Sequence, residues 1–390
     1  MEERNWERVL DVQLHKLLRT GHQDTVDTAL NSLFSVDLVA YDILMDSVEA
    51  VSESDSIVLE VDGESREYDI LLVAAPILAW TRFSIASGQI PADVLNTLSA
   101  HFSAHLLADG THMAMSSTLY SIDQLPRTHA EAYSKVHKLA QSALKGQAVK
   151  SDTRAAETAP FLADTRYLMI AVVAPHNGPI FRWQMPAAQA QQSEARAEAL
   201  AAWITQATPT VARLLPGCGI ELLLPEAYYT ACREADKLIR PVSIRAAVHY
   251  LTHSLACEPS ELRAVIAGFG DESAPEGQVD EYRVAFTRRS DSDVMYGVVW
   301  PLYGQEDEEG TPPEGLGGSS LADLLQPRTP IEEIVEHLNA AGITQVKKLG
   351  ERYVAEYCDD CGAPLFADPS GELVHAEMPE DTATGTEHFH

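Results

Sequence analysis

Two cysteines near the C-terminus stand at the spacing of a metal-binding loop. Residues 357–366 read YCDDCGAPLF, so Asp359 and Asp360 separate Cys358 from Cys361, and Gly362 follows directly. Two thiolates at this separation can share one metal ion, and a glycine after the second cysteine permits the positive φ that the turn of a zinc knuckle needs. A structural zinc ion takes four protein ligands. The run therefore supplies half of a zinc-ribbon-like site, for which zinc is the expected ion.

The remaining ligands must come from farther along the chain. A turn at Asp368–Gly371 predicts a hairpin whose last strand returns toward the cysteines. If that hairpin centres on its turn, Cys361 lies opposite about residue 379, and His375 falls about 13 Å short along the strand. We therefore expect His375 to point away from the thiolates. Other groups that could complete the site are a second subunit or four side chains of the acidic tail: Glu380, Asp381, His388 and His390.

Two alternatives to a metal site remain open for this loop. It could keep the shape of a knuckle without metal, or the two thiols could form a redox pair. The neighbouring carboxylates of Asp359 and Asp360 should raise the thiol pKa values, which disfavours the redox interpretation. The other cysteines, Cys218, Cys232 and Cys257, lie in apolar or helical settings that are typical of buried, inert thiols.

A second candidate site combines arginine and tryptophan at the ends of predicted strands. Trp80 and Arg82 follow one apolar run, and Arg182 and Trp183 follow another. A guanidinium group in such a place could bind a carboxylate or phosphate. Alternatively, each arginine stacks on a tryptophan and pairs with an acidic residue. The sequence holds no phosphate-binding glycine loop, nucleophile elbow or dinucleotide fingerprint, so no enzyme class is indicated.

The composition excludes several classes of partner. The chain has 390 residues, of which 28 are basic and 58 acidic, giving a formal net charge of −30. The negative electrostatic potential of such a protein repels phosphate backbones and anionic lipid, so we expect neither nucleic-acid nor membrane binding. No apolar run is long enough to span a bilayer, and the first residues lack the pattern of a secretion signal. Five cysteines, few and odd in number, favour a reducing compartment, so we expect a cytoplasmic protein.

The order of predicted elements indicates an α+β protein with repeated αβ modules and mixed sheets. Strand, long helix, strand and helix follow one another over residues 68–144 and again over 165–239. We expect five segments: an N-terminal helical segment (1–55), a first αβ module (56–150), a second (151–260), a third with an acidic loop at 304–326 (261–350), and a zinc-ribbon-like hairpin with an acidic tail (351–390).

Over nearly its whole length the chain resembles a family of bacterial proteins known as domain of unknown function 2863. The resemblance rests on five strings: Asp69–Trp80, Leu215–Cys218, Glu281–Arg289, Gly297–Pro301, and the cysteine loop through Val374–Pro379. It implies no activity and no catalytic residues. Our first interpretation is a non-catalytic protein that binds a protein partner or itself. The alternative is an enzyme or small-molecule sensor with an anion pocket lined by arginine and tryptophan. An enzyme should gather titratable groups in one closed cleft, whereas an interaction protein should expose a broad apolar patch.

Overall fold

The structure is a computed structural model of the chain. It describes residues 2–34, 36–61, 64–146, 162–272, 278–303 and 328–379. The chain divides into two compact units, Met1–Lys237 (unit 1) and Leu238–His390 (unit 2). The predicted acidic loop at 304–326 lies outside the described residues.

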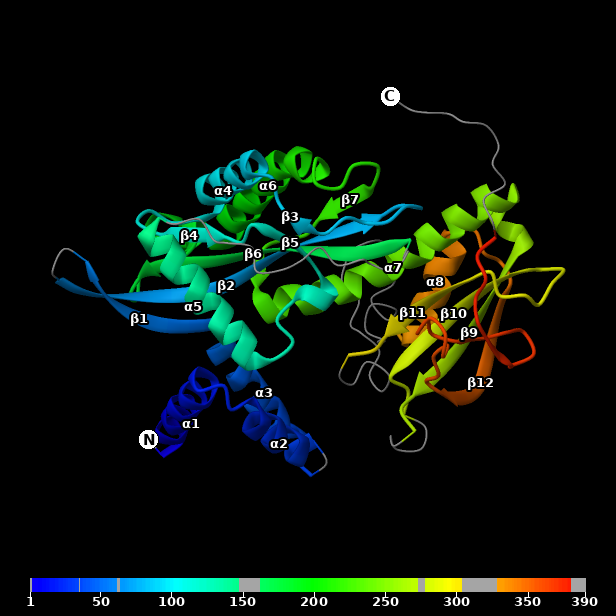
Figure 1. Cartoon of the computed structure of the whole chain (residues 1–390), viewed down its shortest axis with the longest axis horizontal. Helices are drawn as coiled ribbons and strands as arrows, with labels where there is room; N and C mark the ends of the chain where they lie inside the picture. The colour runs from blue at the N-terminus through cyan, green and yellow to red at the C-terminus, as the bar shows by residue number, and fades with distance from the viewer. Residues whose placement is uncertain are drawn as a thin grey trace. The chain divides into compact units, whose positions relative to one another are not determined.

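Unit 1 contains a helical segment and one large sheet with helices on both faces (Figure 1). Its helices and strands are α1 (Glu2–Arg19), α2 (Gln23–Phe34), α3 (Leu38–Glu53), β1 (Ser54–Val61), β2 (Glu64–Trp80), β3 (Gly88–Gln89), α4 (Ala92–Leu106), β4 (His112–Met115), β5 (Thr118–Ser121), α5 (His129–Lys145), β6 (Ala163–Pro175), α6 (Gln192–Ala212), β7 (Gly219–Leu222), β8 (Glu226–Ala227) and the first part of α7 (Tyr228–Leu255).

The sheet of unit 1 is built on two long antiparallel strands. β2 and β6 pair along almost their whole length, from Tyr68 opposite Pro175 to Trp80 opposite Ala163. β4 and β5 pair with the free edge of β6, and β1, β7 and β8 pair with the free edge of β2. Each half of the unit therefore contributes short strands to the long strand of the other half.

The registers of these short strands show an internal duplication. β4 begins opposite Val173 of β6, and β7 begins opposite Trp80 of β2. In the same way β5 pairs with Tyr167, and β8 pairs with Ala74. Counted along the sequence, Trp80 lies as far from Val173 as Ala74 lies from Tyr167. The short strands of the two halves therefore pair with equivalent positions of the two long strands, and the halves share element order and register. The repeat predicted from the sequence is thus present as two interlocked halves of one sheet.

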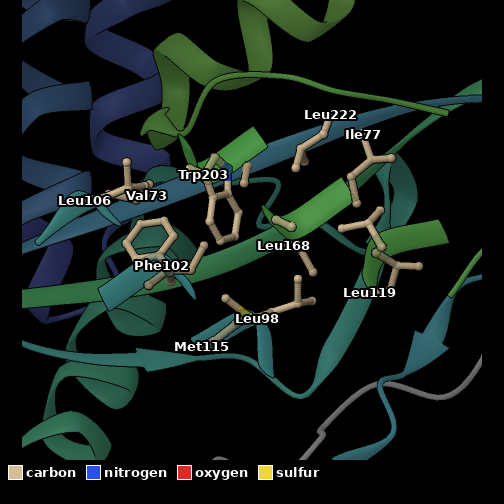
Figure 2. Close-up of a cluster of buried hydrophobic side chains, with 14 of the residues drawn as sticks. Val73, Ile77, Leu98, Phe102, Leu106, Met115, Leu119, Leu168, Trp203 and Leu222 are labelled. Atoms are coloured by element: carbon tan, nitrogen blue, oxygen red, sulfur yellow. The ribbon is translucent and has the colours of Figure 1, made fainter. Parts of the chain in front are cut away.

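Two cores lie on opposite faces of this sheet, because successive residues of each strand point to opposite sides. On one face α4 and α6 pack together, and Phe102 meets Trp203 edge to face at 5.3 Å between ring centroids (Figure 2). On the other face α5 and the start of α7 cover the alternate strand residues, among them Leu72 and Met169. The equivalent helices of the two halves thus share a face, as the duplication requires.

The N-terminal helical segment, α1 to α3, packs its apolar residues on α5 and makes polar contacts with the start of α7, where Arg233 pairs with Glu49 at 2.6 Å and the amide of Tyr229 donates to Glu53 at 3.0 Å. Its small core joins Leu14, Leu30 and Val48 to Tyr133 on α5. Helix α3 begins at an N-cap, where the carboxylate of Asp37 accepts a hydrogen bond from the amide of Ala40 at 3.0 Å. The helical segment is therefore attached to both halves of the duplicated unit, through an apolar core on α5 and polar contacts with α7.

Unit 2 has a four-stranded mixed sheet between helices and a hairpin. Its elements are the end of α7, β9 (Leu262–Gly270), β10 (Glu281–Arg288), β11 (Tyr296–Pro301), α8 (Pro330–Ala340), β12 (Val346–Val354), β13 (Phe366–Ala367) and β14 (Leu373–Val374). β9 to β11 form an antiparallel meander, and β12 pairs parallel to β9. Helices α7 and α8 cover one face, and the β13–β14 hairpin covers the other through Phe366 and Ala367.

The predicted α+β class is confirmed. Mixed pairing occurs in unit 2, whereas the strand pairs of unit 1 are antiparallel. The predicted segments 1–55 and 56–150 fall within unit 1, 261–350 and 351–390 fall within unit 2, and 151–260 spans the boundary within α7.

Candidate metal centre

The cysteine loop is a tight turn closed by backbone hydrogen bonds. The amide of Cys358 donates to the carbonyl of Ala363 at 2.7 Å, and the amide of Gly362 donates to the carbonyl of Cys358 at 2.8 Å. Gly362 has a φ of 71°, as its place in a knuckle predicts. Below the turn, the amide of Leu365 donates to the carbonyl of Glu356 at 3.0 Å, which closes the base of the loop.

A second turn sets the position of His375. One oxygen of the Asp368 carboxylate accepts hydrogen bonds from the amides of Ser370, Gly371 and Glu372 at 2.7 to 2.9 Å. Burial alone would raise the pKa of Asp368, but these hydrogen bonds together lower it. The turn fixes the register of the hairpin, in which Phe366 pairs with Val374. His375 is the next residue after this pair.

The two turns bring three metal-binding side chains together. Nε2 of His375 lies 3.2 Å from Sγ of Cys361, and the ligand atoms of Cys358, Cys361 and His375 all lie within 4.8 Å of one another. Tetrahedral zinc with ordinary bond lengths separates sulfur from nitrogen by about 3.6 Å and two sulfurs by about 3.8 Å. The donor set therefore fits a metal ion of this size, and the three residues could hold one.

The expectation that His375 points away from the thiolates is wrong. The predicted register itself is correct, because pairing of Phe366 with Val374 would place Cys361 opposite residue 379 if the strand continued. The strand does not continue: β13 begins only at Phe366, and the chain before it curls back at Gly362. Because of this turn, the distance between Cys361 and His375 is shorter than it would be if the strand were extended, and the two side chains meet.

The surroundings of the Cys358 thiol favour its thiolate form. The amide of Cys361, followed by that of Asp360, donates a hydrogen bond to it and lowers its pKa below the ordinary value. The carboxylate of Asp360 acts in the opposite direction but is outweighed. Asp360 therefore raises the pKa of this thiol as expected, but the amide hydrogen bonds reverse the net direction of the shift. A thiolate is the form that binds metal.

Among the described residues this is the one group of three or more such side chains arranged to hold a metal ion. The tail residues considered as further ligands, Glu380, Asp381, His388 and His390, lie outside the described residues. The other cysteines are partly buried, and burial raises the pKa of each, in the case of Cys232 to about 12. Their surroundings do not favour the thiolate form.

The four residues predicted to bind an anion lie at opposite ends of the sheet of unit 1. Trp80 ends β2, where its indole ring packs so closely on Gly219 that a Cβ there would overlap it. Arg82 follows it in an exposed position, with its guanidinium 5.0 Å from the ring centroid of Phe83.

The other pair follows β6, whose last residue, Pro175, is opposite Tyr68 at the far end of β2. There Arg182 donates through Nε to the carbonyl of Leu107 at 3.3 Å. Trp183 is buried and stacks on Phe181 at 4.6 Å. The structure therefore brings together Trp80 with Arg82, and Arg182 with Trp183, but does not bring the two pairs to one place.

A cluster of titratable groups around Asp55 could not be predicted from the sequence. The carboxylate of Asp55 lies within 3.1 Å of Nε2 of His15, 2.9 Å of the hydroxyl of Tyr133 and 3.0 Å of Nε2 of His137. These partners belong to α1 and α5, more than thirty residues away on either side, so no local pattern could indicate the cluster. An open pocket beside it is also lined by Asp11 and Asp69. The groups line an open surface and do not form the closed cleft expected of an enzyme.

Comparison with known proteins places the chain in a family. A family model described as "Protein of unknown function (DUF2863)" matches residues 1–389, which confirms the resemblance seen in the sequence. No curated protein and no solved structure matches the chain. In the part of the chain that the structure describes, no helix has the length and apolar character needed to cross a bilayer.

Proposed function

Because the chain belongs to the DUF2863 family, whose function is unknown, we propose from its geometry that it is a cytoplasmic, non-catalytic protein that acts by binding a partner protein. The observation that carries this proposal is an exposed apolar surface on the N-terminal helical segment. We call this surface, formed by Phe34, Val36, Leu38, Val39 and Ile43, the N-terminal apolar face. Between 46% and 85% of the surface of each of these residues is exposed.

The five residues are neighbours because they occupy the end of α2, the connection to α3 and the first two turns of α3. Helix α3 uses a different stripe, Val48 and Val51, for the core that it shares with α1, α2 and α5. Val39 and Ile43 are spaced to lie together on its outer side. Large side chains gathered in this way on a protein surface mark interaction sites more often than they stabilise the chain that carries them.

A groove next to the N-terminal apolar face offers a place for an anchoring side chain. It has a volume of about 470 Å³ and lies between α2, α3 and the start of α5. Its apolar lining includes Leu30, Phe34, Tyr41 and Met45, and Phe34 meets Tyr41 edge to face at 5.2 Å. Large side chains that fill such pockets contribute most of the affinity at protein interfaces.

The charges around this surface favour a partner with basic residues. Asp27, Asp37, Asp42 and Asp46 are exposed around the groove and the apolar face, and the whole chain carries a net charge of −30. Two copies that met through this surface would bring acidic residues toward acidic residues, which is unfavourable. We therefore propose a different protein, with an apolar centre and a basic rim, as the partner.

Site-specific photo-crosslinking in living cells tests this proposal. A photoreactive amino acid at position 43 should give a discrete adduct, whereas the same residue at exposed Thr28 should not. The crosslinked protein, once purified, should bind the wild-type chain and lose at least about tenfold in affinity with Ile43→Asp. Ile43 is exposed, so the variant should keep the melting temperature of the wild type. Absence of an adduct at position 43, or equal affinity of the variant, would refute the proposal.

We further propose that the metal of the Cys358, Cys361 and His375 site is zinc. Two thiolates and one imidazole are ligands that zinc prefers, and tetrahedral geometry suits their separations. Protein purified without chelators should contain about one zinc ion per chain. Cys361→Ser and His375→Ala should each lose it, whereas Cys257→Ser should not. Metal-free wild-type protein would refute this part of the proposal and leave the interaction surface unaffected.

A further inference from the structure

A buried arginine lies directly under the cysteine loop. The side chain of Arg283, on β10, is fully buried, and its Nε donates to the carboxylate of Glu281 at 2.6 Å. The guanidinium carbon lies 4.3 Å from the ring centroid of Phe269 and 5.1 Å from that of Tyr357. The guanidinium is thus held by two aromatic rings and one carboxylate at the point where the loop meets the sheet.

The same guanidinium fastens both ends of the loop. Its Nη1 group donates to the carbonyl of Glu356 at 2.8 Å and to the carbonyl of Leu365 at 2.6 Å. These residues flank the segment that carries Cys358 and Cys361, and they are themselves joined by a backbone hydrogen bond. Leu365 leads directly into β13, whose partner strand leads into His375. One side chain therefore links the two cysteines to the strand that determines the position of the histidine.

The stability of the fold alone does not require a charged side chain at the buried position of Arg283. Its Nη2 group is buried without a hydrogen-bond partner among the described residues. A buried charge with an unsatisfied donor costs free energy, and replacing buried ion pairs by apolar side chains is often neutral or stabilising. A role in holding the cysteine loop accounts for an arginine at this buried position.

We propose that Arg283 is the positioning residue of the metal centre: by joining Glu356 to Leu365 it holds the two thiolates within reach of His375 before metal binds. The inference rests on the proposed binding of zinc. Residues that orient metal ligands from outside the coordination sphere commonly affect affinity by about 10- to 100-fold. Arg283 should therefore set the affinity of the site without contacting the ion.

The test compares the zinc affinity of three full-length proteins: the wild type, Arg283→Met and a matched control, Arg240→Met. Arg240 is also nearly buried in unit 2, donates to the carbonyl of Pro301 at 2.9 Å and lies 5.1 Å from the ring centroid of Trp300. It differs in that these partners, Pro301 and Trp300, belong to β11 and not to the cysteine loop. Zinc alone is the probe, titrated against a chromophoric chelator, with cobalt spectra to report thiolate coordination.

Arg283→Met should weaken zinc binding by about 10- to 100-fold, whereas Arg240→Met should change it by less than about threefold. The increase in melting temperature on adding zinc should fall only in Arg283→Met, because a merely structural loss would lower the apo and zinc-bound proteins equally. Wild-type affinity in Arg283→Met, or an equal loss in Arg240→Met, would overturn the inference. Failure of the wild type to bind zinc would instead refute the proposed metal.

A conservative variant covers the case in which Arg283→Met does not fold. Arg283→Lys keeps the charge but lacks the planar fork that lets one side chain donate to two carbonyls and a carboxylate. It should give a wild-type circular dichroism spectrum and an affinity for zinc at least about fivefold weaker. A folded Arg283→Lys protein with wild-type affinity would also overturn the inference.

Discussion

The carboxylate of Asp55 should be a principal attachment of the N-terminal helical segment to the sheet of unit 1. It joins β1 to His15 on α1 and to Tyr133 and His137 on α5, and only 14% of its side chain is exposed. Hydrogen bonds to a charged group contribute about 1.5 to 3 kcal/mol each, although partly exposed donors recover some of this from water when the acceptor is lost. We expect Asp55→Asn to destabilise unit 1 by about 2 to 4 kcal/mol.

This loss should depend on pH in a defined direction. Burial alone would raise the pKa of Asp55, but the hydrogen bonds from His137, Tyr133 and the amide of Ser56 together lower it below the value of 3.8 for an unperturbed carboxyl. A carboxyl whose pKa is lower in the folded state stabilises the protein above its unfolded pKa and loses that effect as the pH falls through its folded pKa. The difference between wild type and Asp55→Asn should therefore be full at pH 5 and shrink below pH 4.

Urea unfolding, followed by circular dichroism at a series of pH values, measures this difference directly. For a unit of this size the loss corresponds to a decrease of about 4 to 16 °C in melting temperature at neutral pH. Asp11→Asn is the matched control, because Asp11 lies in the same pocket, is 57% exposed and lies 3.6 Å from Nδ1 of His15. It should cost less than about 0.5 kcal/mol. Equal effects of the two substitutions, or a loss for Asp55→Asn that stays constant down to pH 3, would refute the reasoning.

Three further predictions concern Glu53, Gly219 and Cys358. Burial raises the pKa of Glu53 to about 7, so the folded state disfavours its charged form. Glu53→Gln should stabilise the protein by an amount that grows as the pH rises from 4.5 to about 7, measured by urea unfolding. Gly219→Ala should destabilise unit 1 by about 1 to 3 kcal/mol, because its Cβ would overlap the indole ring of Trp80; an unchanged melting temperature would contradict this. Iodoacetamide at neutral pH should alkylate Cys358 well before Cys232 in metal-free protein, since the pKa of the first thiol is lowered and that of the second is raised to about 12. Mass spectrometry of the peptides gives the order.

Local sequence patterns predicted most elements, because each depends on the period of apolar residues and on end signals nearby. Apolar runs predict strands at 68–80 and 165–175, and helical spacing predicts a helix at 330–341; β2, β6 and α8 lie within a few residues of these bounds. The sequence also predicts two helices, at 226–239 and 242–255, separated at Pro241, but Pro241 lies inside the continuous helix α7. The sequence prediction also misses β1, whose edge position leaves alternate residues such as Val58 exposed.

What could not be predicted depends on pairs of residues that are distant in sequence. The interlocking of β2 and β6 joins residues about a hundred positions apart, and nothing local indicates which strand a short segment will pair with. The same limit applies to the metal centre. Its cysteines and hairpin register were predictable, but the position of His375 depends on the curl of the loop that Arg283 holds from another strand. The N-terminal apolar face did have a local signal, since Val39 and Ile43 lie off the core stripe of α3.

The duplication gives the two halves of unit 1 different attachments. Helices α5 and α7 occupy equivalent places on one face of the sheet, and each follows a short strand that pairs with the other half. Helix α5 carries the N-terminal helical segment through Tyr133 and the Asp55 cluster. The boundary between the units falls within α7, and its residues Ile244 and Leu251 belong to the core of unit 2. The apolar contacts of the N-terminal helical segment are thus on α5, whereas α7 supplies the ion pair of Arg233 with Glu49 and continues into unit 2. Asp55→Asn should therefore loosen the segment that carries the proposed partner-binding surface and leave the zinc affinity of unit 2 unchanged, which separates the two proposed activities in one variant.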